Sequence, residues 1–183
     1  MRAIATALPG VLILEPKVFG DARGFFLESY NRKSFAGATG TDPEFVQDNH
    51  SHSAKGVLRG MHLQTGSHAQ GKLVRVASGR VFDVVADVRR SSPTFGRWVG
   101  VELDAEGQRQ FWVPAGYAHG FVVLSDSADF LYKTTTYYAP PHEISVRWDD
   151  PRLGIQWPDL GRPFSLAVRD RDAPLLDERP PIE

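Results

Sequence analysis

The sequence Gly-Val-Leu-Arg-Gly-Met-His-Leu-Gln occupies residues 56–64, and the rest of the chain is interpreted around it. Its apolar residues and two glycines predict a short strand. Strict alternation would place Leu58 and His62 on one face and Arg59 on the other, unless Gly60 permits a bulge that re-aims one of them. His62 faces inward in either geometry. A lone inward histidine is usually a core residue held by a backbone carbonyl, but further titratable side chains recur on later strand-like runs and indicate a functional site. These are Lys72, His119, Tyr132 and several arginines.

Length and composition limit the class of protein. A chain of 183 residues with 42% hydrophobic residues predicts one domain over residues 1–183. The formal net charge of −1 argues against a nucleic-acid partner, while local arginines suit a small anionic ligand. The absence of cysteine excludes disulfides, thiolate metal sites and a cysteine nucleophile. No apolar run reaches membrane-spanning length, so we expect a cytoplasmic protein with no membrane partner.

The chain reads as short strand-like runs separated by Gly, Pro, Asp and Asn turns. In residues 81–88, Phe82 and Val84 share an apolar face while Asp83 lies on the other. Lys72 is in phase with two valines and should point inward, where Asp83 is expected to hold it or another inner cation. About ten strands with hardly a helix predict antiparallel sheets in a sandwich or barrel. Residues 31–35 suggest a single helical turn, and the proline-rich residues 179–183 are expected to be frayed.

The segment from Pro114 to His119 resembles the second motif of the cupin superfamily, a small jelly-roll barrel. The first cupin motif would carry two histidines separated by one residue and then a glutamate, and here His62 is followed at that spacing by Gln64. His62 and His119 alone are too few ligands to fix a divalent transition metal. The resemblance therefore implies an all-β, cupin-type antiparallel jelly-roll barrel with short peripheral helical turns, no metal and no other cofactor.

A closer resemblance covers nearly the whole chain. Residues 21–24, 47–51, 56–64, 72–76, 92–96, 114–121, 132–133 and 147–151 are together similar, in one order, to the dTDP-4-dehydrorhamnose 3,5-epimerase family. That family implies an isomerase that inverts C3 and C5 of dTDP-4-dehydro-6-deoxy-D-glucose to give dTDP-4-dehydro-L-rhamnose. Arg169-Asp170 stands where the family commonly has Lys-Asp, a change that keeps the charge but alters reach and geometry.

The implied chemistry needs a base on one face of the sugar, an acid on the other and a cation near the C4 oxygen. The resemblance assigns these roles to His62, oriented by Asp170, to Tyr132 and to Lys72, for which phosphate contact is the competing role. It further assigns the diphosphate to Arg23, Arg59, His119 and Arg169, substrate contacts to Glu28, Gln47, Asn49 and Glu143, and stacking on sugar or base to Phe26 and Tyr138. Phe26 is equally well explained as a core residue, and Glu143 as a loop carboxylate.

The same resemblance implies a homodimer with strand exchange, in which residues 23–28 reach the neighbouring subunit's pocket. Three other functions stay open at this stage. An epimerase of an antibiotic-sugar pathway would act at C3 or C5 alone. A metal-dependent cupin oxygenase would need further ligands, with His68 as the nearest candidate. A non-catalytic sugar-nucleotide binding module would have no use for a tyrosine and a histidine on opposite strands.

Overall fold

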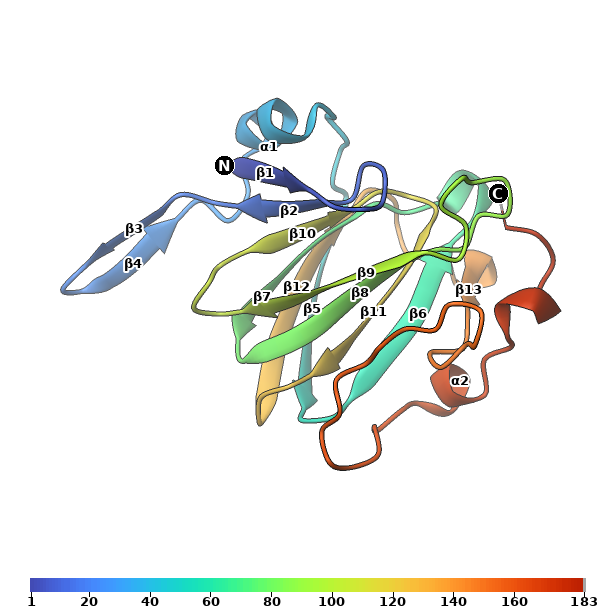
Figure 1. Ribbon diagram of the computed structural model, residues 1–183. Helices are drawn as coiled ribbons and strands as arrows, with labels where there is room; N and C mark the ends of the chain where they lie inside the picture. Colours follow the sequence, from blue (N-terminus) through green and yellow to red (C-terminus); the bar gives the residue numbers. More distant parts are fainter. Residues whose placement is uncertain (183) are drawn as a thin grey trace.

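Two antiparallel sheets that face each other form the body of the molecule (Figure 1), and the computed structural model describes residues 1–182. The predicted antiparallel jelly-roll arrangement is confirmed, since the strands within both sheets pair antiparallel. The six-stranded sheet has the order β1 (Arg2–Ala5), β2 (Leu12–Glu15), β10 (Gln110–Val113), β7 (Lys72–Ser78), β12 (Ser127–Thr134) and β5 (Gln47–Ala54). The five-stranded sheet has the order β13 (Glu143–Ser145), β6 (Leu58–Gln64), β11 (Tyr117–Val123), β8 (Arg80–Asp87) and β9 (Trp98–Asp104).

The inner faces of the two sheets meet in an apolar core. Val74 and Phe130 of the six-stranded sheet lie in one cluster with Val81 and Val85 of the five-stranded sheet. All four side chains are at most 1% exposed. Burying a side chain of this size stabilises a fold by about 1.5–3 kcal/mol relative to leaving it in water. This core closes one part of the space between the sheets and leaves the remainder as a cavity.

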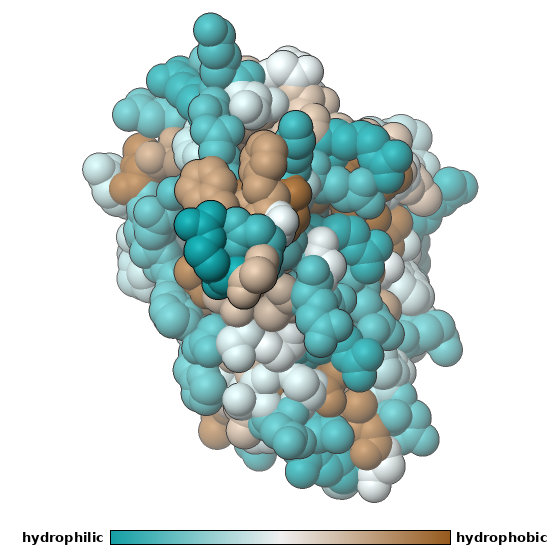
Figure 2. All heavy atoms as spheres, turned by 90° about the vertical axis from the view of Figure 1, so that its left-hand side faces the viewer, coloured by the Kyte–Doolittle hydropathy of each residue, from teal (hydrophilic) through white to brown (hydrophobic). Residues whose placement is uncertain are grey.

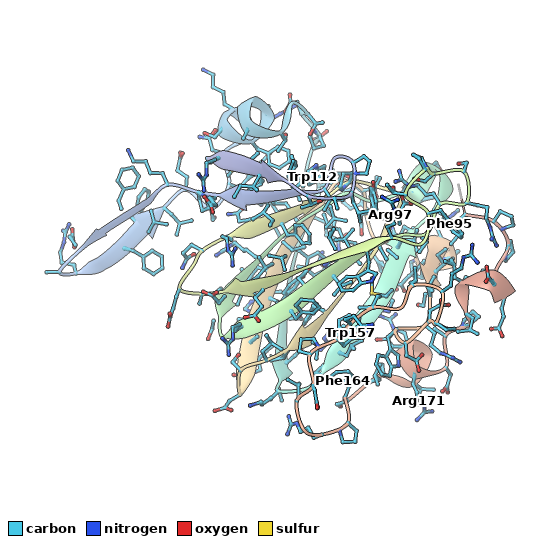
Figure 3. The ribbon with its side chains drawn as sticks, in the orientation of Figure 1. Phe95, Arg97, Trp112, Trp157, Phe164 and Arg171 are labelled. Atoms are coloured by element: carbon cyan, nitrogen blue, oxygen red, sulfur yellow. The ribbon has the colours of Figure 1, made fainter. Side chains whose placement is uncertain are left out.

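The outer face of the five-stranded sheet is also buried. Val84 and the half-buried Phe82, on the face that alternation predicts to be apolar, belong to a second cluster with Leu153 and Trp157 of the C-terminal segment. Figure 3 shows Trp157 against this sheet, and its ring meets that of Phe82 edge-on with centroids 6.2 Å apart. Because it is covered on both faces, every residue of β11 is buried.

The peripheral helices are short, as expected, but the first is longer than the predicted turn at residues 31–35. Helix α1 (Arg32–Thr39) starts at Asn31, whose side chain accepts a hydrogen bond from the backbone N–H of Ser34. It packs onto the six-stranded sheet through Phe35, whose ring centroid lies 5.2 Å from that of Trp112. The other helical segments are η1 (Gly66–His68), η2 (Pro140–His142), α2 (Val168–Arg171) and η3 (Leu176–Glu178).

Two further expectations need correction. Residues 1–182 form thirteen strands rather than about ten, because short strands such as β1 and β13, with four and three residues, are too short to show a visible alternation. The C-terminal tail is not frayed as far as residue 182. Ile182 is 7% exposed, and its carbonyl accepts a hydrogen bond from the backbone N–H of Arg90 at 2.7 Å. Residue 183 lies outside the described residues.

A two-stranded hairpin of β3 (Val18–Asp21) and β4 (Gly24–Leu27) projects from the body (Figure 1). Its aromatic side chains Phe19, Phe25 and Phe26 are 52%, 63% and 66% exposed. Figure 2 views the molecule from the side of this hairpin and shows hydrophobic groups beside hydrophilic ones at its projecting end. A hairpin that presents three exposed aromatic rings has the composition of a surface that packs against another protein.

Candidate active site

A cavity of about 550 Å³ opens between the two sheets. Its walls come from β5, β7 and β12 of one sheet, from β6, β11 and β13 of the other, and from the segment that leads into α2. Most of the residues singled out in the sequence converge here. They are Gln47, Asn49, Arg59, His62, Lys72, His119, Tyr132, Tyr138, Glu143, Arg169 and Asp170.

The central strand β6 does not alternate regularly. Arg59 and His62 are three residues apart and would lie on opposite faces of an ideal strand, yet both line the cavity. The pairing of β11 with β6 is irregular between His119 and Phe121. At Gly60, φ is +137°, and a Cβ there would come within 2.5 Å of the Cα of Gly120. The absence of a side chain at Gly60 therefore permits both the close approach of the strands and the kink.

His62 forms a short hydrogen bond with Asp170. The distance from His62 Nε2 to Asp170 Oδ1 is 2.7 Å, and the backbone N–H of Gly60 lies 3.4 Å from Asp170 Oδ2. Burial alone would raise the pKa of Asp170, but the hydrogen bond with His62, the backbone N–H of Gly60 and the charge of Arg169 outweigh burial and lower that pKa below its ordinary value. Asp170 is therefore an acceptor only, so Nε2 of His62 carries the proton and Nδ1 is left to accept one.

Lys72 points into the cavity from the opposite sheet, as its phase with Val74 and Val76 predicts. Burial lowers its pKa to about 8, while the negative charges of Glu143 and Asp83 act to raise it. The ammonium group lies 3.4 Å from the backbone oxygen of His62. Lys72 is consequently a cation at neutral pH, held close to the strand that carries the imidazole.

Tyr132 lines the same cavity from β12, where its neighbours in the adjacent strands are Asn49 and Val74. Its pKa is raised chiefly by burial and further by the nearby charge of Glu143. The phenol therefore keeps its proton at neutral pH. Since His62 lies on the five-stranded sheet and Tyr132 on the six-stranded sheet, a base and an acid stand on opposite walls of one cavity.

His119 forms a second histidine–aspartate pair beside the first. It is the cross-strand neighbour of His62, and its Nε2 lies 2.8 Å from Oδ1 of Asp83. His119 is 7% exposed and Asp83 is fully buried. Asp83 was expected to hold Lys72 or another inner cation, and its direct hydrogen bond is to His119, while the charge of Lys72 also acts on the same carboxyl group.

Gln64 occupies the position where the cupin motif would supply a metal ligand. Its side-chain amide forms hydrogen bonds with backbone groups instead. Its Nε2 donates to the carbonyl of His68 at 2.8 Å, and its Oε1 accepts from the backbone N–H of Ala139 at 2.7 Å. Gln64 thereby ties together the two loops at this end of the cavity. Among residues 1–182, no group of three or more His, Cys, Asp or Glu side chains is arranged to hold a metal ion.

At the cavity mouth, Glu143 accepts two hydrogen bonds. The Tyr138 hydroxyl donates at 2.8 Å and the Arg169 guanidinium at 3.1 Å. Arg169 also lies 3.6 Å from Asp170, so the arginine joins the cavity mouth to the histidine–aspartate pair. Glu143 is therefore a hydrogen-bonded residue of the cavity wall and not a free loop carboxylate.

The inner face of β5 supplies amides and hydroxyls. Gln47 donates to Asn49 at 2.9 Å and accepts from the backbone N–H of Tyr138 at 3.0 Å. Sequence reasoning missed Ser51 and Ser53, although they continue the same alternation. Ser53 accepts from Arg59 Nε at 3.1 Å and orients the guanidinium, while the buried Ser51 hydroxyl has no partner among the described residues.

Three predicted site residues lie outside this cavity. Arg23 and Phe26 are on the projecting hairpin, and Glu28 follows it. Arg23 donates to Asp21 at 2.6 Å, and Glu28 accepts from Asn31 at 3.0 Å. Within one chain, therefore, these three side chains do not meet the other candidate residues.

Comparisons with known proteins agree with this geometry. The family model for dTDP-4-dehydrorhamnose 3,5-epimerase matches residues 5–178. The chain belongs to the dTDP-4-dehydrorhamnose 3,5-epimerase family. The family member from Salmonella typhimurium is 60% identical over 97% of each chain. The expected resemblance is thus confirmed.

Solved structures of the epimerase family share the fold. An epimerase from Legionella pneumophila in complex with dTDP-4-keto-L-rhamnose is 52% identical, with a TM-score of 0.92 over 96% of this chain and 93% of the other. The 3'-monoepimerase ChmJ from Streptomyces bikiniensis, in complex with dTDP-quinovose, is 39% identical, with a TM-score of 0.89 over 97% and 88%. The cupin-type jelly roll is therefore confirmed for this chain. No helix within residues 1–182 is long and apolar enough to cross a membrane.

Proposed function

We propose that this protein, acting as a single domain, inverts C3 and C5 of dTDP-4-dehydro-6-deoxy-D-glucose and gives dTDP-4-dehydro-L-rhamnose. The observation that carries the proposal is the placement of the His62–Asp170 pair on one wall of the cavity and of Tyr132 and Lys72 on the other. Inversion next to a ketone requires a base and an acid on opposite faces of the ring. A binding module would not need that arrangement.

The proposed mechanism follows from the acidity of protons beside the C4 ketone. Nδ1 of His62 removes the proton from C3 or C5, and Asp170 stabilises the imidazolium that results. The Lys72 ammonium stabilises the enolate oxygen at C4, a placement that acts where charge develops. Tyr132 donates a proton to the opposite face of the carbanion. The two centres flank the same carbonyl, so one set of groups serves both.

The remaining wall residues suit a nucleoside diphosphate. Arg59, held by Ser53, presents a guanidinium for bidentate contact with phosphate. Arg169 and His119 add positive charge or hydrogen-bond donors for the diphosphate, while Gln47, Asn49 and Glu143 contact the sugar and Tyr138 stacks on it or on the base. The cytoplasm is the proposed location, as the sequence analysis led us to expect.

The test is an NMR time course in deuterated water with dTDP-4-dehydro-6-deoxy-D-glucose. Deuterium at both C3 and C5, with the L-rhamno configuration in the product, is the expected result. The similarity to the 3'-monoepimerase ChmJ favours one alternative, an enzyme that acts at C3 alone. In that case deuterium would enter C3 and the C5 proton would persist.

We further infer a homodimer in which Arg23, Phe26 and Glu28 of one chain complete the pocket of the other. The support is the projecting hairpin with its exposed aromatic side chains and the separation of these residues from the cavity of their own chain. Light scattering at micromolar concentration should give twice the chain mass of 20.3 kDa. A fully active 20.3 kDa monomer would contradict the inference.

A matched pair of variants localises the interface. Phe25→Ser in the hairpin should weaken the dimer, because it removes an apolar side chain that is 63% exposed in the single chain. Val168→Ser removes an apolar side chain of similar exposure, 66%, in α2 and should leave the measured mass unchanged. Equal masses for the two variants at every concentration would point to another interface.

Prolonged chelation should leave turnover unchanged. The donors that a cupin would offer to a metal are already engaged, since the Nε2 atoms of His62 and His119 bond to Asp170 and Asp83 and the Gln64 amide bonds to the backbone. The measurement compares the rate before and after dialysis against EDTA. Loss of activity that zinc, iron or nickel restores would revive the oxygenase reading.

A further inference from the structure

One polar group on the cavity wall has no place in the mechanism given above. The hydroxyl of Ser51 on β5 is buried and has no hydrogen-bond partner among the described residues. Ser51 lines the cavity. A buried hydroxyl without a partner costs free energy, because it gives up its hydrogen bonds to water and gains none in return. A polar group that enters the cavity would supply the missing partner.

The neighbours of Ser51 explain why its hydroxyl is left over. Asn49 and Ser53 lie on the same face of β5. The side-chain oxygen of Asn49 accepts a hydrogen bond from within the strand at 2.9 Å, and the hydroxyl of Ser53 accepts one from Arg59. The residue opposite Ser51 on β12 is Phe130, whose ring is apolar. The protein groups beside Ser51 therefore do not supply its partner.

A stack of two aromatic rings joins the strand of Ser51 to the strand of Arg59. Phe130 is the cross-strand neighbour of Ser51, and Phe121 on β11 is that of Arg59. The two rings lie with centroids 4.1 Å apart and an interplanar angle of 14°. Beside this stack the Arg59 guanidinium reaches across to the hydroxyl of Ser53 at 3.1 Å. Ser51 and Ser53 are two residues apart, which is about 7 Å along a strand. The free hydroxyl and the guanidinium thus border the same part of the cavity.

The polar groups around this part of the cavity suit an anion. The acidic side chains among the described residues that line the cavity, Asp170 and Glu143, already bond to His62 and to groups at the cavity mouth. The hydroxyl of Ser51 and the guanidinium of Arg59 are both hydrogen-bond donors. A phosphate group presents several acceptor oxygens, so it can accept from both donors at once.

We propose that Ser51 is a further substrate-binding residue, whose hydroxyl donates a hydrogen bond to the diphosphate held by Arg59. The inference rests on the proposed function, because it assigns the hydroxyl to a sugar nucleotide. The diphosphate takes no part in proton transfer, so this hydrogen bond stabilises the bound substrate and the transition state alike. Its loss should therefore raise KM and leave kcat close to that of the unaltered protein.

The first experiment measures binding without turnover. Calorimetric titrations with dTDP and with inorganic pyrophosphate compare Ser51→Ala with the unaltered protein, and the variant should bind both anions about tenfold more weakly. A loss confined to dTDP would place the hydroxyl at the nucleoside, and equal affinities of the two proteins would show that water alone meets the hydroxyl. Either result overturns the proposal, as does a failure of pyrophosphate to bind the unaltered protein. Binding of both anions without epimerisation would contradict the proposed function and not the role of Ser51.

Ser125→Ala is the matched control. Ser125 is also half-buried but lies outside the cavity, and its hydroxyl accepts from the backbone N–H of Arg80 at 2.7 Å and donates to the carbonyl of Ser127 at 2.6 Å. Its replacement should lower the melting temperature and leave the affinity for dTDP unchanged. Ser51→Ala should show the reverse, because its hydroxyl has no protein partner to lose. A clear fall in the melting temperature of ligand-free Ser51→Ala would reveal such a partner and overturn the proposal.

The second experiment measures initial rates of epimerisation with dTDP-4-dehydro-6-deoxy-D-glucose. For Ser51→Ala, KM should rise about tenfold while kcat stays close to that of the unaltered protein. A fall in kcat at unchanged KM would place the hydroxyl at the reacting atoms, and the assignment of Ser51 to the diphosphate would be wrong.

Discussion

Replacing Asp170 with asparagine is expected to lower kcat by up to about 10⁴-fold while preserving the fold. An amide presents only one acceptor oxygen and no charge, so it neither fixes the tautomer of His62 nor stabilises the imidazolium that forms when His62 takes a proton. The lowered pKa of Asp170 shows that its charged form is the one stabilised by His62, and that stabilisation is what the variant removes. Initial rates of epimerisation, measured at saturating substrate, give the loss directly.

Asp172→Asn is the control for this variant. Asp172 caps the same short helix, but it is exposed and pairs with Arg171 at 2.7 Å instead of with a cavity residue. Its replacement should leave kcat near that of the unaltered protein. A wild-type kcat for Asp170→Asn would rule out the pairing, and Asp83 would not serve as a substitute partner because it is engaged by His119.

The walls of the cavity could be predicted where the chain alternates regularly. Gln47 and Asn49 on β5, Lys72 on β7 and Tyr132 on β12 all point where a period of two places them. The same rule would have found Ser51 and Ser53. Regular alternation thus predicts which side chains share a wall of the cavity, because side chains two residues apart lie on the same face of a strand.

Geometry that depends on contacts between distant segments could not be predicted from the pattern. The joint placement of Arg59 and His62 in the cavity needs the irregular pairing beside Gly60, which only the approach of β11 reveals. The choice between Asp170 and Asp83 as the partner of each histidine depends on distances across the fold. The resemblance to the epimerase family predicted the pairing of His62 with Asp170. For Asp83, the sequence left the partner open between Lys72 and another cation.

The short elements were missed for a related reason. β13 places Glu143 opposite Gln64 at the cavity mouth, yet three residues show no period. The tail was expected to fray because of its prolines, but Ile182 packs under the five-stranded sheet and bridges to Arg89. In both places tertiary packing, and not local propensity, determines the conformation.

The second prediction with a large effect separates the two walls of the cavity. His62→Ala should abolish both deuterium uptake and inversion, because no enolate forms without a base. Tyr132→Phe keeps the ring and deletes the proton that the raised pKa of the phenol retains at neutral pH. This variant should still bind substrate and should still take up deuterium when His62 returns a solvent-derived proton to the face from which it came, while net inversion collapses.

Deuterium content and product configuration must be followed together, since either alone would confuse a lost base with a lost acid. Tyr138→Phe is the matched control, because it removes a hydroxyl from another tyrosine of the same cavity that bonds to Glu143 and is 50% exposed. It should change substrate binding more than inversion. If Tyr132→Phe epimerises at the wild-type rate and Tyr138→Phe does not, the proton donor stands at the cavity mouth, and the assignment of Tyr132 to the second wall is wrong.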